Sequence, residues 1–170
     1  MLAQYFEQMS EFVIIVPLVY LLIIGFPLAL IDMREHRLPN RLTLSSALLT
    51  AVAVLWVAYL TGEWGRSLLA LTIGLATFLI GWFLAAKNFI GMGDIKLLIS
   101  LNTLAGYFYP LLPVLSMTLG FVLASVVSGL RLLLRKIDAA SSIALGPYLL
   151  LGFYLSVYPT AAVSTAEALS

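Results

Sequence analysis

The sequence predicts an all-α protein: a polytopic transmembrane helix bundle of about six spans, with the N-terminus outside the cytosol. Three observations lead to this prediction. Of the 170 residues, 62% are hydrophobic and only 10% are charged, whereas soluble domains carry about 25% charged residues. The apolar residues gather in runs of roughly the 20 residues that a helix needs to cross a bilayer. The basic residues are unevenly divided between alternate connecting segments, as the positive-inside rule describes.

Six apolar runs define the expected spans, at about 12–31, 42–60, 68–86, 95–108, 111–134 and 143–158. The first run follows Glu7 and Glu11 rather than basic residues, so we interpret it as a retained helix and not as a signal peptide. The fourth run is short, and it could continue into the fifth as one bent segment, which would give five spans. Tyr109-Pro110 and Pro113 lie at that junction. Because proline removes a backbone donor and restricts the residue before it, two helices joined by a tight turn are the better prediction.

Orientation follows from the basic residues, which favour cytosolic loops. With the N-terminus outside, eight of the nine basic residues face the cytosol: Arg34, Arg37, Arg41, Lys87, Lys96, Arg131, Arg135 and Lys136. Only Arg66 faces the other side. We therefore expect a multi-pass protein of the inner (cytoplasmic) membrane, with residues 1–170 forming one domain.

The composition also excludes several kinds of site. The chain has no cysteine and a single histidine, His36, so disulfides, thiol catalysis and zinc sites built from cysteine or histidine are not expected. We expect no metal and no cofactor. The formal net charge of +1 gives no indication of a nucleic-acid partner.

Two carboxylates at apolar helix ends are the candidate catalytic residues, because such groups are costly near lipid and usually functional. Asp32 ends the first run, and Asp94 lies between the third and fourth runs. The predicted topology places both at the cytosolic boundary. Two neighbouring carboxyls share a proton, since both cannot ionise cheaply. The ionised member can then activate water while the protonated one polarises a peptide carbonyl.

Asp94 belongs to the segment Gly91-Met92-Gly93-Asp94. Gly91 and Gly93 would let the helix unwind and let a substrate backbone approach closely. The alternative is a tight turn in which Asp94 only caps the fourth helix.

Two further motifs are expected to shape the site. Pro39-Asn40 has the features of a helix start, with Asn40 as the N-cap of the second span and Pro39 fixing the incoming backbone, so that the loop after Asp32 has a defined geometry. Gly146-Pro147 lies inside the last predicted span. It is either a kink or an opened backbone that adds hydrogen-bond donors near the site. Lys96 either snorkels to the interface, which we favour, or stabilises the ionised form of Asp94.

Together these motifs resemble the type IV prepilin peptidases, a family of Gly-x-Gly-Asp membrane aspartyl proteases. Asp32 with Leu38-Pro39-Asn40 resembles the first catalytic motif, and the segment from Gly91 to Leu98 closely resembles the second. The segment from Ala144 to Leu149, which contains Gly146-Pro147, resembles the late Gly-Pro motif. The resemblance covers about residues 15 to 158.

The resemblance implies that Asp32 and Asp94 are the catalytic aspartates of an aspartic endopeptidase. It also implies the partner: a prepilin or pseudopilin, whose short basic leader is removed at the cytosolic membrane face, before a hydrophobic helix. Larger members of the family carry a cytosolic insertion with cysteine pairs and also methylate the product. This chain has no cysteine and only about ten residues between its first two spans, so we expect a peptidase without a separate methyltransferase domain.

Two other functions fit part of the pattern. A transporter coupled to ions or protons also needs intramembrane carboxylates and broken helices, but it needs them at the bilayer midplane, whereas Asp32 and Asp94 are predicted at one boundary. A non-catalytic assembly protein of a secretion system would not need both aspartates. The sequence does not indicate which pilin-like protein is the substrate or what the oligomeric state is.

Overall fold

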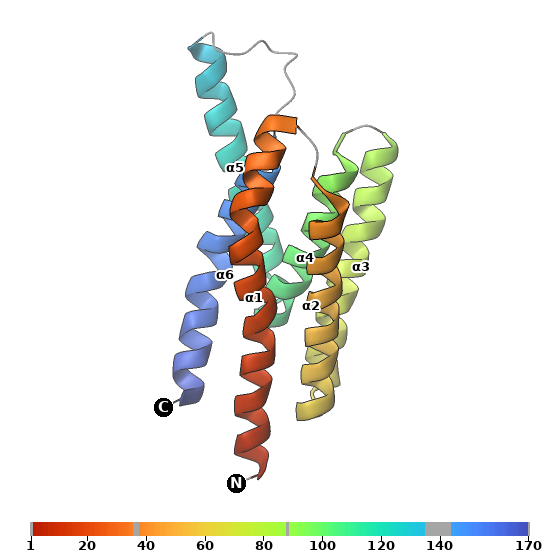
Figure 1. Cartoon of the computed structure of the whole chain (residues 1–170), viewed down its shortest axis with the longest axis vertical. Helices are drawn as coiled ribbons and strands as arrows, with labels where there is room; N and C mark the ends of the chain where they lie inside the picture. Colours follow the sequence, from red (N-terminus) through yellow and green to blue (C-terminus); the bar gives the residue numbers. More distant parts are fainter. Residues whose placement is uncertain (1, 36–37, 88, 135–143, 170) are drawn as a thin grey trace.

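The structure is a computed structural model that describes residues 2–35, 38–87, 89–134 and 144–169, without the side chains of residues 2–8, 11 and 161–169. Six helices run through these ranges: α1 (Leu2–Glu35), α2 (Asn40–Thr61), α3 (Trp64–Ala86), α4 (Met92–Phe108), α5 (Leu112–Leu133) and α6 (Gly146–Leu169). They form an elongated bundle in which both chain termini lie at the same end (Figure 1). The prediction of an all-α bundle is confirmed.

Four of the described helices are long and apolar enough to cross a membrane by themselves: the part of α1 from Phe12 to Glu35, α2, α3 and α5. Helix α4 has 17 residues, which gives a length of about 26 Å at 1.5 Å per residue. That length falls slightly short of a hydrocarbon core of about 30 Å. The structure is therefore consistent with about six spans, of which the fourth is short, as the sequence predicts.

Helix α1 is longer than the predicted first span. It has 34 residues and ends at Glu35, with Pro17 and Pro27 inside it. The sequence pattern suggested that the helix stops before Asp32, and this is wrong. Asp32 lies in the last turn of α1, so a helix rather than a loop fixes its backbone.

The junctions between helices explain why the chain turns where it does. Helix α2 ends at Gly62, whose φ of 76° lies in the left-handed region that favours glycine. Helix α4 ends at Phe108, and α5 begins at Leu112 with Pro113 in its first turn. Proline is tolerated there because the first helical N–H groups have no partner within the helix. The prediction of two helices separated at Pro110 is confirmed.

Helix α4 lies at the centre of the bundle, where it packs against α2, α3, α5 and α6. Its middle contributes Leu97, Leu101 and Leu104 to the core, each almost completely buried. Helix α3, in contrast, exposes large apolar side chains such as Leu75 and Trp82 along much of its length. An apolar outer face is expected where lipid is the solvent.

Polar contacts join the helices inside this apolar bundle. The hydroxyls of Thr50 and Ser100 link α2 to α4 at 3.3 Å, and the Tyr154 hydroxyl of α6 donates to the Leu21 carbonyl of α1 at 2.8 Å. Because the bilayer core offers no water, polar side chains there must be satisfied within the protein. These contacts join α2 to α4 and α6 to α1. Helices α1, α4 and α6 carry the candidate site.

Candidate functional site: two aspartates at one end of the bundle

The first aspartate lies at the contact between α1 and α6. Asp32 is buried, with 4% of its surface exposed. The backbone N–H of Gly146, the first residue of α6, donates to Asp32 Oδ2 at 2.8 Å. A hydrogen bond from a helix N-terminus stabilises negative charge on a carboxylate. Asp32 is therefore placed to hold a negative charge inside the bundle.

Gly146 is where a side chain would disturb this contact. A Cβ atom on Gly146 would lie 2.8 Å from Asp32 Oδ2 and 3.3 Å from its Cγ. Glycine therefore permits the close approach of the α6 backbone to the carboxylate. Of the two alternatives, the kink is wrong, because α6 begins at Gly146 and Pro147 is its second residue. The alternative interpretation, a backbone donor near the site, agrees with the Gly146 N–H.

The second aspartate lies in the first turn of α4. Gly91 is the N-cap, with extended backbone (φ −69°, ψ 140°) and no side-chain capping bond, and Asp94 follows three residues later. The alternative in which Asp94 simply caps this helix is therefore wrong. Its Oδ1 atom is buried and has no hydrogen-bond partner among the described residues. Such a group is costly unless it is protonated or meets a ligand.

The environment of Asp94 favours its protonated form. Burial, and to a smaller extent the negative charge of Asp32, together raise the pKa of this carboxyl from 3.8 to about 7. The effect of Asp32 means that the two carboxyls, which come from different helices, lie within electrostatic reach of each other. Asp94 precedes the predicted fourth span, which begins at Ile95, so the pair lies at the boundary of the bundle.

Gly93 serves a packing role that the sequence did not indicate. A Cβ atom on Gly93 would lie 3.0 Å from Leu38 Cβ and 3.3 Å from the Leu38 backbone nitrogen. Gly93 is helical in this structure, so its ability to let the helix unwind for a substrate stays a prediction. It lets the segment before α2 lie directly against the first turn of α4, close to Asp94.

The start of α2 differs from the prediction in its cap. Pro39 occupies the N-cap position without a side-chain bond, and Asn40 is the first helical residue. The assignment of Asn40 as the N-cap is therefore wrong, although the helix does start at this motif. The Asn40 side chain is free for another role, since its Oδ1 accepts a hydrogen bond from Lys96 Nζ at 2.7 Å. Lys96 thus ties α4 to α2, and the sequence analysis did not foresee this contact.

The site residues from the sequence therefore divide into two groups. Asp32, Asp94, Gly146 and Gly91 meet around the carboxylates, while Gly93, Pro39 and Asn40 fix the α2–α4 contact beside them. Pro147 is the second residue of α6, directly after Gly146. Within the described part of the chain, no three histidine, aspartate or glutamate side chains form a group that could hold a metal ion. Leu38 was identified only as part of the Leu38-Pro39-Asn40 motif. Its packing against Gly93 could not be predicted, because a contact between segments far apart in the chain leaves no local sequence pattern.

Fold and site together define a class: a polytopic membrane protein with one buried and one partly buried carboxyl, electrostatically coupled, at one end of its helix bundle. The chain belongs to the type IV leader peptidase family, whose model matches residues 15–134, well over half of the sequence. The match includes both Asp32 and Asp94 and ends before Gly146. No match is found among the curated proteins or among the solved structures. The family identifies the protein as a peptidase and confirms the resemblance noted in the sequence.

Proposed function

We propose that this protein is an aspartic endopeptidase that removes the short basic leader of a prepilin or pilin-like secretion protein at the cytosolic face of the membrane. Asp32 and Asp94 are its catalytic residues. The observation that carries the proposal is the electrostatic coupling of a buried carboxyl on α1 with a partly buried one on α4. The two have unequal partners: a backbone donor for Asp32 and none among the described residues for Asp94 Oδ1. Unequal surroundings are what separates the base from the acid in a carboxylate pair.

The two roles follow from these surroundings. Asp32, which accepts the Gly146 N–H, is the ionised member and takes a proton from the attacking water. Asp94, whose pKa is raised to about 7, is the protonated member and donates to the scissile carbonyl oxygen. In a coupled pair the proton belongs to both groups, so these are roles in one protonation state of the dyad.

The reaction then balances without a further cofactor. Water adds to the carbonyl carbon as Asp32 receives one of its protons and Asp94 gives its own proton to the carbonyl oxygen, which forms a gem-diol. Collapse of the gem-diol breaks the C–N bond. The proton on Asp32 moves to the leaving nitrogen, and a diol hydroxyl returns a proton to Asp94. Both carboxyls end in the state in which they began.

The cytosolic location is supported by charge. The aspartate end of the bundle, meaning the end of α1 and the starts of α2, α4 and α6, also holds most of the described basic residues: Arg34, Arg41, Lys87, Lys96 and Arg131. Arg66 lies toward the other end, where its Nε donates to the Tyr107 carbonyl. By the positive-inside rule, the aspartate end faces the cytosol of a cytoplasmic-membrane protein. A basic leader would reach this end from the cytosol, while the hydrophobic helix that follows it stays in the bilayer.

A cleavage assay tests the proposal. Purified protein in lipid vesicles is mixed with a tagged prepilin-like substrate, and Asp32→Asn and Asp94→Asn are assayed in parallel. Each substitution is nearly isosteric and removes one ionisable member of the pair. We expect the wild type to release the leader and each variant to lose about 10³-fold or more in kcat/KM, the upper range for loss of an acid–base group.

The variants must stay folded for this result to count, which thermal unfolding in detergent reports. Normal cleavage by either folded variant would refute the aspartyl mechanism. If the wild type cleaves none of several substrates, proton flux in the same vesicles would instead favour a transporter, and absence of both activities would favour an assembly protein.

A further inference from the structure

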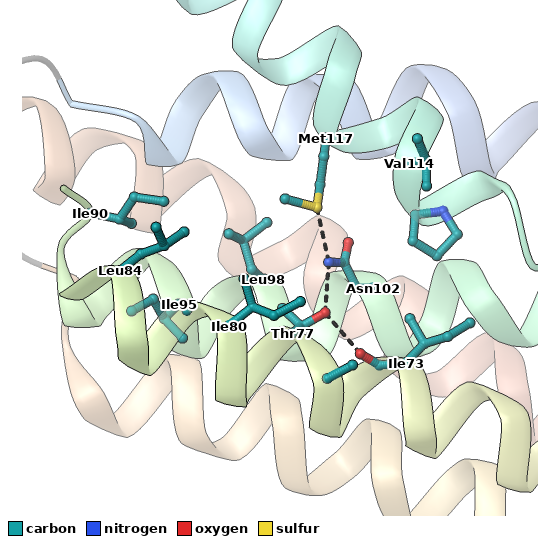
Figure 2. Close-up of a pocket in the computed structure, with 13 residues that line it drawn as sticks. Ile73, Thr77, Ile80, Leu84, Ile90, Ile95, Leu98, Asn102, Val114 and Met117 are labelled. Atoms are coloured by element: carbon teal, nitrogen blue, oxygen red, sulfur yellow. Dashed lines mark hydrogen bonds between the residues drawn. The ribbon is translucent and has the colours of Figure 1, made fainter. Parts of the chain in front are cut away.

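A cavity of about 240 Å³ lies between α3, α4 and α5, apart from the two aspartates. Its wall is almost entirely apolar, with Leu84, Ile90 and Ile95 toward the aspartate end and Val114 of α5 toward the other end (Figure 2). Its volume lies below the roughly 300–1,000 Å³ of typical small-molecule sites. The space suits a few large apolar side chains rather than a cofactor.

The cavity begins on α4 at Ile95, the residue directly after Asp94. Asp94, Leu98 and Asn102 are spaced four residues apart on α4, so they lie along one side of that helix. Leu98 and Asn102 line the cavity, as does Ile95 directly after Asp94. From Ile95 to Asn102 the helix rises by about 10 Å at 1.5 Å per residue. The cavity thus leads from the boundary of the bundle toward the middle of the membrane.

One polar group stands out in the apolar wall. Asn102 is 2% exposed, and its amide nitrogen donates to Thr77 Oγ1 at 3.0 Å and to Met117 Sδ at 3.2 Å (Figure 2). Its Oδ1 is buried and has no hydrogen-bond partner among the described residues. Both amide hydrogens are used and the oxygen is not, so Asn102, a residue of the wall, holds a buried unsatisfied acceptor that a donor would stabilise.

We propose that this cavity seats the apolar segment of the substrate that follows the scissile bond, and that Asn102 Oδ1 accepts a hydrogen bond from a donor in that segment. The inference rests on the proposed peptidase function. It is carried by Ile95, which follows Asp94 directly and lines the cavity, and by the unpaired acceptor of Asn102 in the same wall. A segment that runs down this side of α4 keeps its peptide bond at the aspartates while its apolar residues stay out of water.

A lipid acyl chain is the competing occupant. It would fill the same apolar space, but it has no hydrogen-bond donor and would leave Oδ1 unsatisfied at the same cost as before. A polypeptide segment offers hydroxyl or N–H donors along its length. Polar side chains that hydrogen-bond between transmembrane helices are a common source of specificity in lipid. The substrate is therefore the occupant that matches both features of the cavity.

Cysteine cross-linking tests directly whether the substrate segment binds in the cavity, because the chain has no cysteine of its own. Ala76→Cys places a thiol in the cavity wall, and Leu75→Cys places one on the opposite, lipid-facing side of α3, where Leu75 is 58% exposed. Both are made with Asp94→Asn so that the substrate stays intact. A prepilin-like substrate carries single cysteines over about ten positions after the scissile bond, which covers a depth of 10 Å for extended or helical chain.

We expect oxidation to link Ala76→Cys to a small group of neighbouring substrate positions and Leu75→Cys to none. Ile80→Cys, in the same wall, repeats the test should Ala76→Cys fail to fold. Equal cross-linking from the lipid-facing position, or none from either wall position, would contradict binding of the substrate segment in the cavity and would favour a lipid chain as its occupant. Because cleavage by the wild type is measured separately, this failure is distinct from failure of the proposed function.

The role of Asn102 is tested with substrates whose apolar segment carries one serine at successive positions. We expect one serine position to lower KM by about fivefold with the wild-type enzyme, the value of one hydrogen bond, with kcat unchanged. Asn102→Leu should abolish this preference. Thr77→Val is the matched control, because it removes a contact of the Asn102 amide but leaves Oδ1 in place, so the preference should persist. A KM that ignores serine position, or a preference that survives Asn102→Leu, contradicts the assigned role.

Discussion

The two aspartates occupy helix ends that differ in almost every respect. Asp32 lies in the last turn of α1, a helix of 34 residues, and receives a backbone hydrogen bond from the start of α6. Asp94 lies in the first turn of α4, which has 17 residues, and its Oδ1 has no described partner. The long helix holds its carboxylate in a fixed contact, whereas the short one presents a carboxyl that burial keeps protonated.

This difference shows how one bundle can make two identical side chains chemically unequal. The negative charge of a carboxylate is stabilised where a hydrogen-bond donor reaches its oxygen. A carboxyl from which water is excluded instead favours its protonated form. At Asp32 the donor comes from a third helix, α6, so the site requires α1, α4 and α6 to assemble. The comparison therefore predicts which substitutions remove the chemical difference between Asp32 and Asp94, which reduce it and which leave it unchanged.

The largest effect is expected from removing both carboxyls together. If Asp32 and Asp94 act as a unit, the double variant Asp32→Asn/Asp94→Asn should lose no more kcat/KM than either single variant, about 10³-fold or more. Residues that contribute independently would give losses that multiply. Single-turnover cleavage in lipid vesicles measures the three variants against the wild type, and a multiplied loss would contradict the shared-proton mechanism.

The next effect comes from the donor that distinguishes Asp32. Gly146→Ala should lower kcat by up to about 100-fold, because its Cβ would lie 2.8 Å from Asp32 Oδ2 and the carboxylate would have to move. The control is Gly129→Ala in α5, where the structure describes nothing within 4 Å of an added Cβ. That variant should cleave normally. Unchanged kcat in Gly146→Ala would show that the contact does not position Asp32.

The sequence contained enough information for the bundle but not for all of its details. Apolar runs and proline positions predict the helices because burial in lipid and the missing proline donor act locally. The end of α1 was misplaced because the polar stretch from Asp32 to Glu35 looks like a loop, while the helical backbone continues through it to satisfy its own hydrogen bonds. The local sequence could not predict that Asp32 accepts a hydrogen bond from α6, because that helix lies far from Asp32 in the chain.

The same limit applies to the smaller features of the site. Asp32 and Asp94 were identified because charges at apolar helix ends are rare, which is a compositional signal. The Gly93–Leu38 and Lys96–Asn40 contacts join segments far apart in the chain, and they depend on how α2 and α4 pack. Asn102 was missed because one asparagine in an apolar run is informative only once its unpaired oxygen and the cavity beside it are known.

A pH profile sharpens the comparison between the two carboxyls. Asp94 must be protonated to donate, and its pKa is raised to about 7 by burial and by Asp32. Activity should therefore fall as the pH rises through about 7. Asp32→Asn removes the negative charge of Asp32, so the pKa of Asp94 should decrease in this variant. The infrared band of the protonated carboxyl C=O measures this pKa, with Asp94→Asn as the reference. A profile that stays flat between pH 6 and pH 8 would contradict the assignment of Asp94 as the acid.

The same shift predicts how stability depends on pH. The folded protein holds the Asp94 proton up to about pH 7, while the unfolded chain releases it near 3.8. Since the folded state binds more protons in this window, the free energy of unfolding should decrease as the pH rises through it. Asp94→Asn removes this contribution, so its Tm should exceed that of the wild type more at pH 8 than at pH 5. An equal difference at both values would contradict the sign.

The smallest effect is expected at the contact beside the pair. Lys96 Nζ donates to Asn40 Oδ1 at 2.7 Å in an exposed position, where water competes and such contacts contribute little. Lys96→Met should lower kcat/KM by about two- to threefold, because it loosens the α2–α4 junction without touching either carboxyl. Asn40→Leu should have a similar effect, and the double variant should be no worse than either one, since both remove the same bond. Lys87→Met, which removes the other lysine at this end of the bundle, is the control and should be unchanged. A loss of kcat/KM as large as that of Asp94→Asn would instead mean that Lys96 takes part in catalysis. The charge of Lys96 would then contribute to the chemical difference between the two aspartates.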